Sequence, residues 1–173
     1  MLPDFAHSLY QAFEREKIPL LLAGGWAVCH HGYSRLTLDV DWVCPRSKEA
    51  PAVALMDTLG FAKMTGGMAS RFKNRKVAVF PYIDLIWVDD ATFVKMAEPD
   101  PGPTSPTLPV INFRALLAMK LHALKDGEAR DYRDLNDLRL LLKHGHMKIP
   151  DIEFKAMCQR YAGPDAYNQI RLL

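Results

Sequence analysis

The fold is decided by residues 20–44, which read LLLAGGWAVCHHGYSRLTLDVDWVC. The apolar run at the start of this stretch predicts a short buried strand over 19–23. Gly24 and Gly25 end that strand, because glycine adopts the backbone conformations that a tight turn requires. A short helix is expected over 26–31. The stretch therefore begins as a strand, a glycine turn and a helix.

The second half of the stretch places two acids on one predicted strand. Residues 37–44 alternate in polarity, so Asp39 and Asp41 are expected to project from the same face, with Cα atoms ~7 Å apart. Two neighbouring carboxylates repel each other and lose hydration, which a divalent cation would compensate, and Mg²⁺ prefers such oxygen ligands. For this short pattern alone, two solvated acids at an exposed strand end are at least as good an explanation.

The residues around this pair favour a metal and phosphate site. Glycines between a strand and a helix let a phosphate approach the backbone N–H groups, although Gly24 and Gly25 can also serve only a tight turn. Asp84 lies within the apolar run of residues 82–88 (YIDLIWV), which predicts a further strand. A buried acid is costly unless it is paired or binds a metal. The glycine turn and the three aspartates therefore form one consistent pattern.

A proline-rich segment divides the chain. Residues 98–110 (EPDPGPTSPTLPV) contain five prolines, and this density excludes a helix or a central strand and favours an extended connector. We therefore predict a core over 1–97, a linker over 98–110 and a helical subdomain over 111–173. The further predicted elements are helices over 4–17, 48–59, 113–125, 130–143 and from about 150, and strands over 70–74 and 76–80.

The composition of the 173 residues excludes several classes of protein. The chain is 49% hydrophobic and 24% charged with a net charge of +2, which excludes a largely disordered protein. No apolar run reaches the ~18 residues of a membrane span, and no secretory signal is recognisable. The three cysteines fit neither a zinc site nor a disulfide framework. We expect a cytoplasmic protein without strong non-specific binding to nucleic acid.

Together, AGGWAVCHHGYSRLTLDVDWVC and the later YIDLIW resemble the DNA polymerase β-type nucleotidyltransferase superfamily. Its signature is an apolar strand, two small residues, a spacer, Asp-x-Asp and a third acid on a later strand; here 13 residues separate Gly25 from Asp39. The particular form is similar to minimal bacterial branches, namely AbiEii toxin-like proteins and small antibiotic nucleotidyltransferases. The resemblance implies an α/β (α+β) fold, in which a short mixed sheet flanked by helices precedes a small C-terminal helical subdomain.

The C-terminal half carries a second match to AbiEii-like proteins. These have a helical lysine followed by a Lys/Arg-Asp-x-x-Asp-Leu segment, which here correspond to Lys120 and to RDYRDL at residues 130–135. The resemblance assigns phosphate binding to Lys120 and a supporting role to Asp131, in preference to Asp134. The alternative is a surface lysine whose ammonium reaches solvent and a solvated helix face with i,i+3 and i,i+4 ion pairs.

Trp26 departs from the superfamily pattern. Many members have a serine directly after the glycines, where its hydroxyl meets the terminal phosphates, but the AbiEii-type and antibiotic branches resemble this chain in lacking it. Phosphate contact would then fall on backbone N–H groups and on Arg35 or Lys120. Arg35 can instead pair with Asp39 or Asp41.

Two other groups of residues have weaker interpretations. A basic stretch either guides a nucleotide or RNA phosphate or discourages aggregation at a strand edge. Its members are Arg71, Lys73, Arg75 and Lys76. The adjacent His30 and His31 face different directions on a helix, so we expect packing or capping from them and no zinc site.

These features lead to one hypothesis, a nucleotidyltransferase that moves an NMP group from an NTP to a hydroxyl and releases pyrophosphate. Mg²⁺, or Mn²⁺, would be held by Asp39, Asp41 and Asp84, in a cleft between the two halves. The phosphates would lie against Gly24 and Gly25.

The acceptor hydroxyl belongs to a tRNA 3′ end, a protein or a small molecule, and an antitoxin is a candidate partner. One alternative is a non-catalytic nucleotide-binding or toxin–antitoxin interaction module of the same fold. Another is a metal-dependent hydrolase that uses the same acids.

Overall fold

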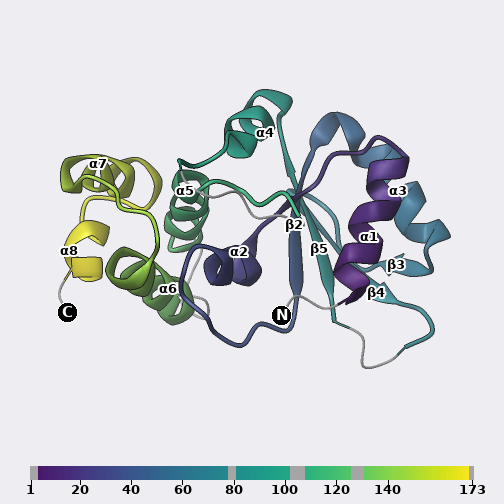
Figure 1. Cartoon of the computed structure of the whole chain (residues 1–173), viewed down its shortest axis with the longest axis horizontal. Coiled ribbons are helices and arrows are strands. Elements are labelled where there is room, and N and C mark those ends of the chain that lie inside the picture. The colour runs from purple at the N-terminus through teal and green to yellow at the C-terminus, as the bar shows by residue number, and fades with distance from the viewer. Residues whose placement is uncertain (1–3, 78–80, 102–107, 126–130, 172–173) are drawn as a thin grey trace. The chain divides into compact units, whose positions relative to one another are not determined.

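The computed structural model describes residues 4–77, 81–101, 108–125 and 131–171 (Figure 1). The chain forms two compact units, of which the first comprises residues 1–27 and 35–112 and the second residues 28–34 and 113–173. The proline-rich segment is thus grouped with the first unit, and the short segment 28–34 with the second. The domain boundaries at 97 and 110 stay predictions.

In the described part of the first unit, five strands form one mixed sheet in the order β1-β2-β5-β4-β3. Strands β2 and β5 are parallel, whereas the other neighbouring pairs are antiparallel. The strands are β1 (Leu21–Leu22), β2 (Val40–Pro45), β3 (Phe61–Lys63), β4 (Ala69–Asn74) and β5 (Ile83–Val88). The predicted α+β class with a short mixed sheet is therefore confirmed.

Helices cover this sheet because their apolar residues recur at helical spacing. On α1, Ala6, Leu9 and Phe13 share one face and are buried, and they join residues of the sheet and of α3 in one core. Figure 1 shows α1 and α3 side by side. The helices of this unit are α1 (Asp4–Arg15), α2 (Gly24–His30, whose last residues belong to the second unit), α3 (Glu49–Thr58, preceded by a 3₁₀ turn at Arg46–Lys48) and α4 (Asp90–Ala97).

The strand that carries the paired acids is shorter than predicted. It begins at Val40, whose N–H donates to the carbonyl of Tyr82 (3.0 Å), and Val40 is in register with Ile83, the first residue of β5. Residues 37–39 extend beyond the start of β5 and so have no ladder partner on it. Asp39 therefore lies directly before β2, and only Asp41 lies within the strand.

Other predicted boundaries also changed. The strand over 19–23 is reduced to Leu21–Leu22, and the helix over 26–31 already begins at Gly24. Of the strand predicted over 76–80, residues 76 and 77 lie outside any strand and 78–80 lie outside the described residues. Strand β3 and helices α4 and α8 were not predicted, although the side chain of Asp89 caps α4 by accepting from the N–H of Thr92 (2.9 Å).

The end of the proline-rich segment runs along β1. The N–H of Leu22 donates to Pro109 (2.8 Å), and the N–H of Ile111 donates back to Leu22 (3.0 Å). Leu108 is buried in the core of the first unit. The amide of Asn112 donates to the carbonyl of Lys95 (2.6 Å), near the end of α4. Backbone pairing, which proline permits at a sheet edge, thus fixes this end of the segment.

The described part of the second unit is helical, as predicted. Its buried side chains include Phe113, Leu117 and Leu121 on α5 and Phe154 on α7. An ion pair between Arg114 Nε and Glu153 Oε1 (2.5 Å) links the same two helices. The helices are α5 (Phe113–Ala123), α6 (Asp131–His144), α7 (Asp151–Tyr161) and α8 (Ala166–Arg171).

The segment 28–34 packs with these helices through His31. This side chain is buried, its ring centroid lies 5.5 Å from that of Phe113, and its carbonyl accepts from the N–H of His146 (3.0 Å). The packing role expected for His31 is therefore confirmed. Within the described ranges, every helix is too short or too polar to cross a membrane.

A buried hydrogen bond between β4 and β5 provides a test of the sheet. The indole Nε1 of Trp87 donates to the hydroxyl of Ser70 (3.0 Å), and both side chains are buried. Ser70→Ala should lower the free energy of unfolding by about 1–3 kcal/mol, because it leaves a buried N–H without an acceptor. Urea unfolding measures this cost. In a Trp87→Phe background the cost should be smaller, and equal costs in both backgrounds would contradict the assignment.

Candidate active site

The glycine turn packs directly against the strand that carries the acids. Gly24 has a φ of +56°, and a β-carbon there would overlap the carboxylate of Asp41 and lie 2.9 Å from its Cβ. A β-carbon at Gly25 would lie 2.8 Å from Cβ of Thr37 and 3.1 Å from Nη2 of Arg35. Both glycines are thus required by close packing, and Gly24 also by its backbone conformation. The structure places Gly24, Gly25, Arg35 and Asp41 together.

The three predicted aspartates also converge in the first unit. Asp41 and Asp84 are in register on the parallel neighbours β2 and β5, so their side chains project from the same face of the sheet. Asp39 lies one residue before β2. Both Asp39 and Asp84 contact the side chain of Arg71. The sequence pattern therefore identified acids that meet at one place.

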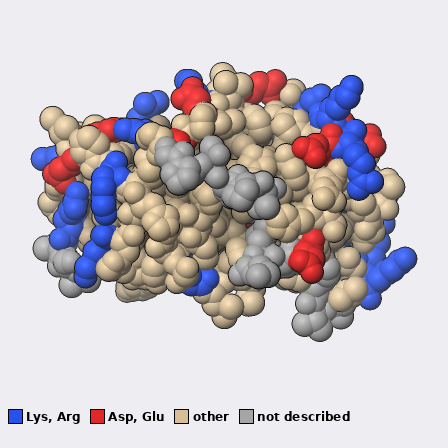
Figure 2. All heavy atoms as spheres, in the orientation of Figure 1, with Lys and Arg blue, Asp and Glu red and all other residues tan. Residues whose placement is uncertain are grey.

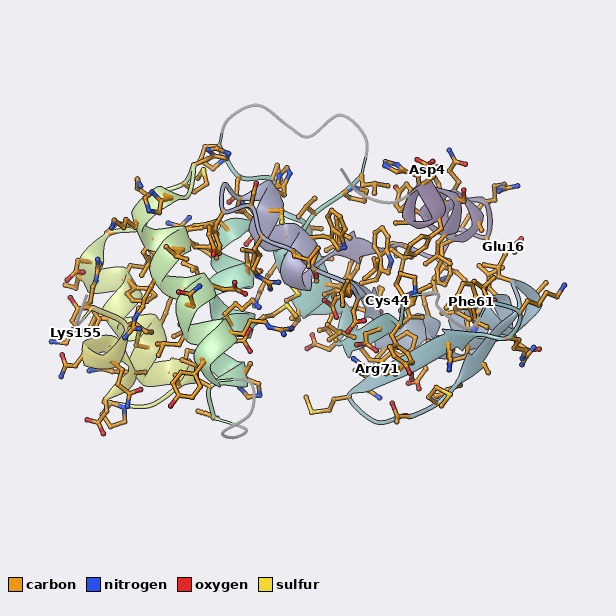
Figure 3. All side chains as sticks on the ribbon, turned by 90° about the horizontal axis from the view of Figure 1, so that it is seen from below. Asp4, Glu16, Cys44, Phe61, Arg71 and Lys155 are labelled. Atoms are coloured by element: carbon orange, nitrogen blue, oxygen red, sulfur yellow. The ribbon has the colours of Figure 1, made fainter. Side chains whose placement is uncertain are left out.

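Arg71, on β4 (Figure 3), contributes positive charge at this place. Its Nε donates to Oδ1 of Asp84 (2.9 Å) and its Nη2 to Oδ2 (2.6 Å), while Nη2 also lies 3.7 Å from Oδ2 of Asp39. Its Cζ lies 5.1 Å from the ring centroid of Tyr82. The hydrogen bonds to Asp84, more than the attraction of Asp39 and Asp41, raise the pKa of Arg71 above its usual range.

Sequence reasoning missed this role of Arg71. The strand-edge interpretation is wrong for it, because β4 lies between β5 and β3 within the sheet. Arg71 is in register with Asp84 on the antiparallel neighbour β5, which explains the two-point contact. Part of this contact could be predicted from the sequence. Pairing of the predicted strands 70–74 and 82–88 as a hairpin brings the basic stretch opposite Asp84, but it does not specify which basic side chain faces that acid.

Asp84 is paired, as expected for an acid in an apolar strand. Its neighbours Ile83 and Leu85 are buried in the core, so Asp84 lies on the opposite face, where its side chain is 14% exposed. Arg71 therefore accounts for the tolerance of this carboxylate without invoking a metal.

The carboxylates at this place have the chemistry of divalent-cation ligands, but they are not arranged as a complete metal site. Within the described residues, no group of three or more His, Cys, Asp or Glu side chains is arranged to hold a metal ion. Carboxylate oxygens are the ligands that Mg²⁺ prefers, and Asp39 and Asp41 lie at a place where three acids already attract a cation. Both oxygens of Asp84 accept from Arg71. Asp39 and Asp41 are thus the better candidates for metal ligands.

Trp26, at the position where the resemblance to the superfamily predicts a serine, has a packing role. Its half-buried ring packs against the core of the first unit. Its Nε1 is buried and has no hydrogen-bond partner among the residues that the structure describes. Trp26 therefore offers no hydroxyl at the turn.

In the second unit, Lys120 belongs to a buried charge cluster. Its Nζ lies 2.5 Å from Oδ1 of Asp134 and 2.8 Å from Oδ2 of Asp137, and all three residues are buried. The interpretation of Lys120 as a surface lysine is therefore wrong. Sequence reasoning missed Asp137, which lies three residues after Asp134 and thus on the same face of α6. Asp131 is the first residue of α6, and its side chain lies outside the described part.

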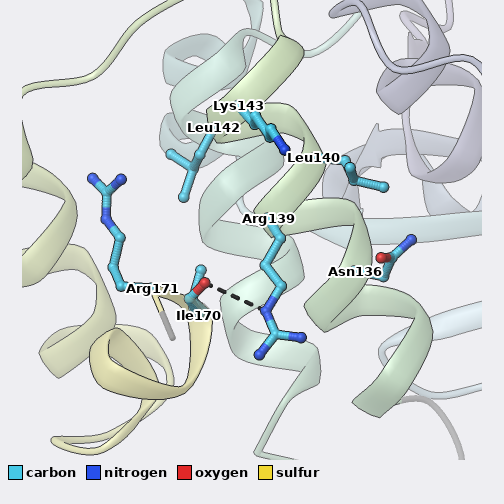
Figure 4. Close-up of a pocket in the computed structure, with 7 residues that line it drawn as sticks. All are labelled: Asn136, Arg139, Leu140, Leu142, Lys143, Ile170 and Arg171. Carbon is cyan, nitrogen blue, oxygen red and sulfur yellow. Dashed lines mark hydrogen bonds between the residues drawn. The ribbon is translucent and has the colours of Figure 1, made fainter. Parts of the chain in front are cut away.

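A pocket in the second unit lies between α6 and α8 (Figure 4). Arg139 lines it, but its Nε donates to the carbonyl of Ile170 (3.3 Å) and its Nη2 to that of Gln169 (2.5 Å). Arg171 pairs with Asp151. Figure 2 shows Lys and Arg gathered over the end of the chain where α7 and α8 lie. The contacts of these two arginines therefore hold α8 against α6 and α7.

The fold is similar to that of several solved structures, two of which are antibiotic nucleotidyltransferases. ANT(2")-Ia in complex with adenylyl-2"-tobramycin has a TM-score of 0.69 and 14% identity, over 91% of this chain and 95% of that chain. The lincomycin-bound lincosamide antibiotic adenylyltransferase LnuA has a TM-score of 0.56 and 18% identity, over 82% and 98%. JHP933 from Helicobacter pylori has a TM-score of 0.52 and 14% identity, over 97% and 88%. At these identities the likeness shows the fold alone.

Among curated proteins, none matches this chain in sequence. The family described as nucleotidyl transferase AbiEii toxin, type IV TA system, matches residues 70–171, which is more than half of the 173 residues. The matched region contains Asp84, Lys120 and Asp131, whereas Asp39 and Asp41 precede it. The resemblance seen in the motifs is therefore confirmed, and the chain belongs to the AbiEii nucleotidyl transferase toxin family.

Proposed function

We propose that this protein is a Mg²⁺-dependent nucleotidyltransferase that moves an NMP group from an NTP to an acceptor hydroxyl and releases pyrophosphate. One observation carries the proposal: three aspartates meet beside a glycine turn that packs on one of them. The family and the fold support the same reaction class.

In this proposal Asp39 and Asp41 hold Mg²⁺, or Mn²⁺ in its place. When bound, the metal neutralises charge on the triphosphate and so favours departure of pyrophosphate. Gly24 and Gly25 pack closely against Asp41 and Thr37, so their backbone lies beside the acids, and in this proposal its N–H groups bind the phosphates. Arg35, beside Gly25, contributes positive charge to the same phosphates.

Asp84 is the proposed general base for the acceptor hydroxyl. It lies beside Asp41 on the neighbouring strand, and it takes the proton of the attacking hydroxyl while Arg71 holds it in orientation. It is also a proposed further metal ligand. Positioning of the reactants and compensation of charge would supply most of the catalysis, since phosphoryl-type transfer asks little covalent chemistry of the protein.

The acceptor is a tRNA 3′ end, a protein or a small molecule. The similar structures include one with adenylyl-2"-tobramycin and one with lincomycin, which favours a small-molecule hydroxyl. The family is one of toxins in type IV toxin–antitoxin systems, which favours a cellular macromolecule and an antitoxin partner. The non-catalytic alternative is favoured by Trp26 in the serine position and opposed by the convergence of all three aspartates.

The test follows label from α-labelled ATP, CTP, GTP and UTP into RNA, protein and small-molecule fractions of a bacterial extract with Mg²⁺. Wild-type protein should label one fraction, and Asp41→Asn should lower the rate by about 100-fold or more, because a neutral amide is a poor ligand for Mg²⁺. Mg²⁺-dependent nucleotide binding without any transfer would select the non-catalytic alternative. Release of free nucleotide would select the hydrolase.

Gly24→Ala is expected to lower activity by about 100-fold, because the added methyl overlaps the carboxylate of Asp41 and must displace it. Gly60→Ala is the matched control, since Gly60 also has a positive φ (+88°) but open space where its β-carbon would lie. Both variants carry backbone strain, so melting temperatures report that shared cost. Equal losses of transfer activity in the two variants would argue against the proposed contact.

Lys120→Met should lower the free energy of unfolding by about 3–5 kcal/mol, because it leaves Asp134 and Asp137 buried without their cation. Urea unfolding measures this, with Lys125→Met on the exposed end of the same segment as a control. A change below about 0.5 kcal/mol would contradict the buried cluster. The predicted phosphate role requires in addition a raised KM for the NTP in variants that remain folded.

A further inference from the structure

Arg71 is more tightly engaged than a surface arginine on a strand. Four groups surround it: both oxygens of Asp84, the carboxylate of Asp39 and the face of the Tyr82 ring. A guanidinium is always charged and its N–H groups form a rigid planar fork, so the two hydrogen bonds fix the plane of the Asp84 carboxylate. Neither the charge of the guanidinium nor its planar geometry changes with the surroundings of the site.

The same guanidinium stands where positive charge is required. Asp39, Asp41 and Asp84 all attract Arg71 electrostatically, and Nη2 bonds Asp84 (2.6 Å) while lying 3.7 Å from Asp39. A divalent cation on Asp39 and Asp41 would share these carboxylates with Arg71 and be repelled by it. One arginine therefore acts both on the proposed metal ligands and on Asp84, the proposed general base.

We infer that Arg71 is a positioning residue that orients Asp84 and competes with the divalent cation for the charge of the aspartates, and so weakens metal binding until the nucleotide arrives. The inference rests on the proposed function, in that Asp39 and Asp41 are taken as metal ligands. The triphosphate brings negative charge of its own, which offsets the repulsion between Arg71 and the metal.

Two substitutions separate the charge of Arg71 from its geometry. Arg71→Gln removes the positive charge, whereas Arg71→Lys keeps the charge but replaces the planar fork by a single ammonium. The matched control is Arg75→Gln, four residues along the chain, because Arg75 pairs with the exposed Asp57 and contacts none of the three aspartates in a described ion pair. Melting temperatures establish that each variant is folded.

The first measurement is binding of Mn²⁺ alone, without nucleotide, followed by the electron paramagnetic resonance signal of free Mn²⁺. Arg71→Gln should bind Mn²⁺ about tenfold more tightly than wild type, because the competing charge is gone. Arg71→Lys and Arg75→Gln should stay within about twofold of wild type. An affinity of Arg71→Gln that is unchanged or weaker would overturn the competition.

The second measurement is NMP transfer at saturating Mg²⁺. Arg71→Gln and Arg71→Lys should both lower kcat by about 100-fold with little change in the KM for the NTP, because Asp84 loses its two-point orientation in each. Full rescue of kcat by Arg71→Lys would overturn the positioning role. If Arg71→Gln fails to fold, Arg71→Lys decides that role by itself.

Failure of the inference is distinguishable from failure of the proposed function. If Asp41→Asn binds Mn²⁺ as tightly as wild type, the aspartates are not the metal ligands and the proposed function falls. If Asp41→Asn loses Mn²⁺ while Arg71→Gln leaves its affinity unchanged, the metal site stands and only the role of Arg71 is overturned.

Discussion

The site depends on one close contact, between a turn without side chains and the strand beside it. Gly24 and Gly25 bring their backbone so near to Asp41 and Thr37 that no β-carbon fits at either position. The contact sets where Asp41 lies relative to the turn. The N–H of Ala23 donates to the carbonyl of Asp41 (2.9 Å), so backbone pairing holds the same two segments together.

The pairing of the strands brings the three acids together and also compensates their charge. Pairing of β2 with β5 brings Asp41 next to Asp84, which alone would set two like charges on neighbouring strands. Pairing of β4 with β5 brings Arg71 opposite Asp84 and supplies the cation. The order of the strands therefore determines the charge balance, and the order β2-β5-β4 is the part of the topology on which the proposed chemistry depends.

Sequence reasoning could predict the residues of the site better than their partners. Asp39, Asp41, Asp84 and the glycines follow from local patterns, because spacing along the chain and apolar context carry their signal. The roles of Arg71 and Asp137 could not be predicted, because they come from strand register and helix packing, which depend on distant parts of the chain. The start of β2 was misplaced for the same reason: periodicity predicts an extended segment, but only the position of β5 decides where pairing begins.

The two charge clusters differ in a way that bears on function. In the first unit the side chains of Arg71 and Asp39 are 34% and 41% exposed and that of Asp84 is 14% exposed, whereas in the second unit those of Lys120, Asp134 and Asp137 are 10%, 11% and 1% exposed. Exposed charges exchange partners at little cost, since water solvates them as they separate, but separating a buried pair leaves both charges without solvation. Exchange of ligands is what a metal and nucleotide site requires. Burial therefore favours the Arg71 cluster for chemistry and the Lys120 cluster for holding α5 against α6.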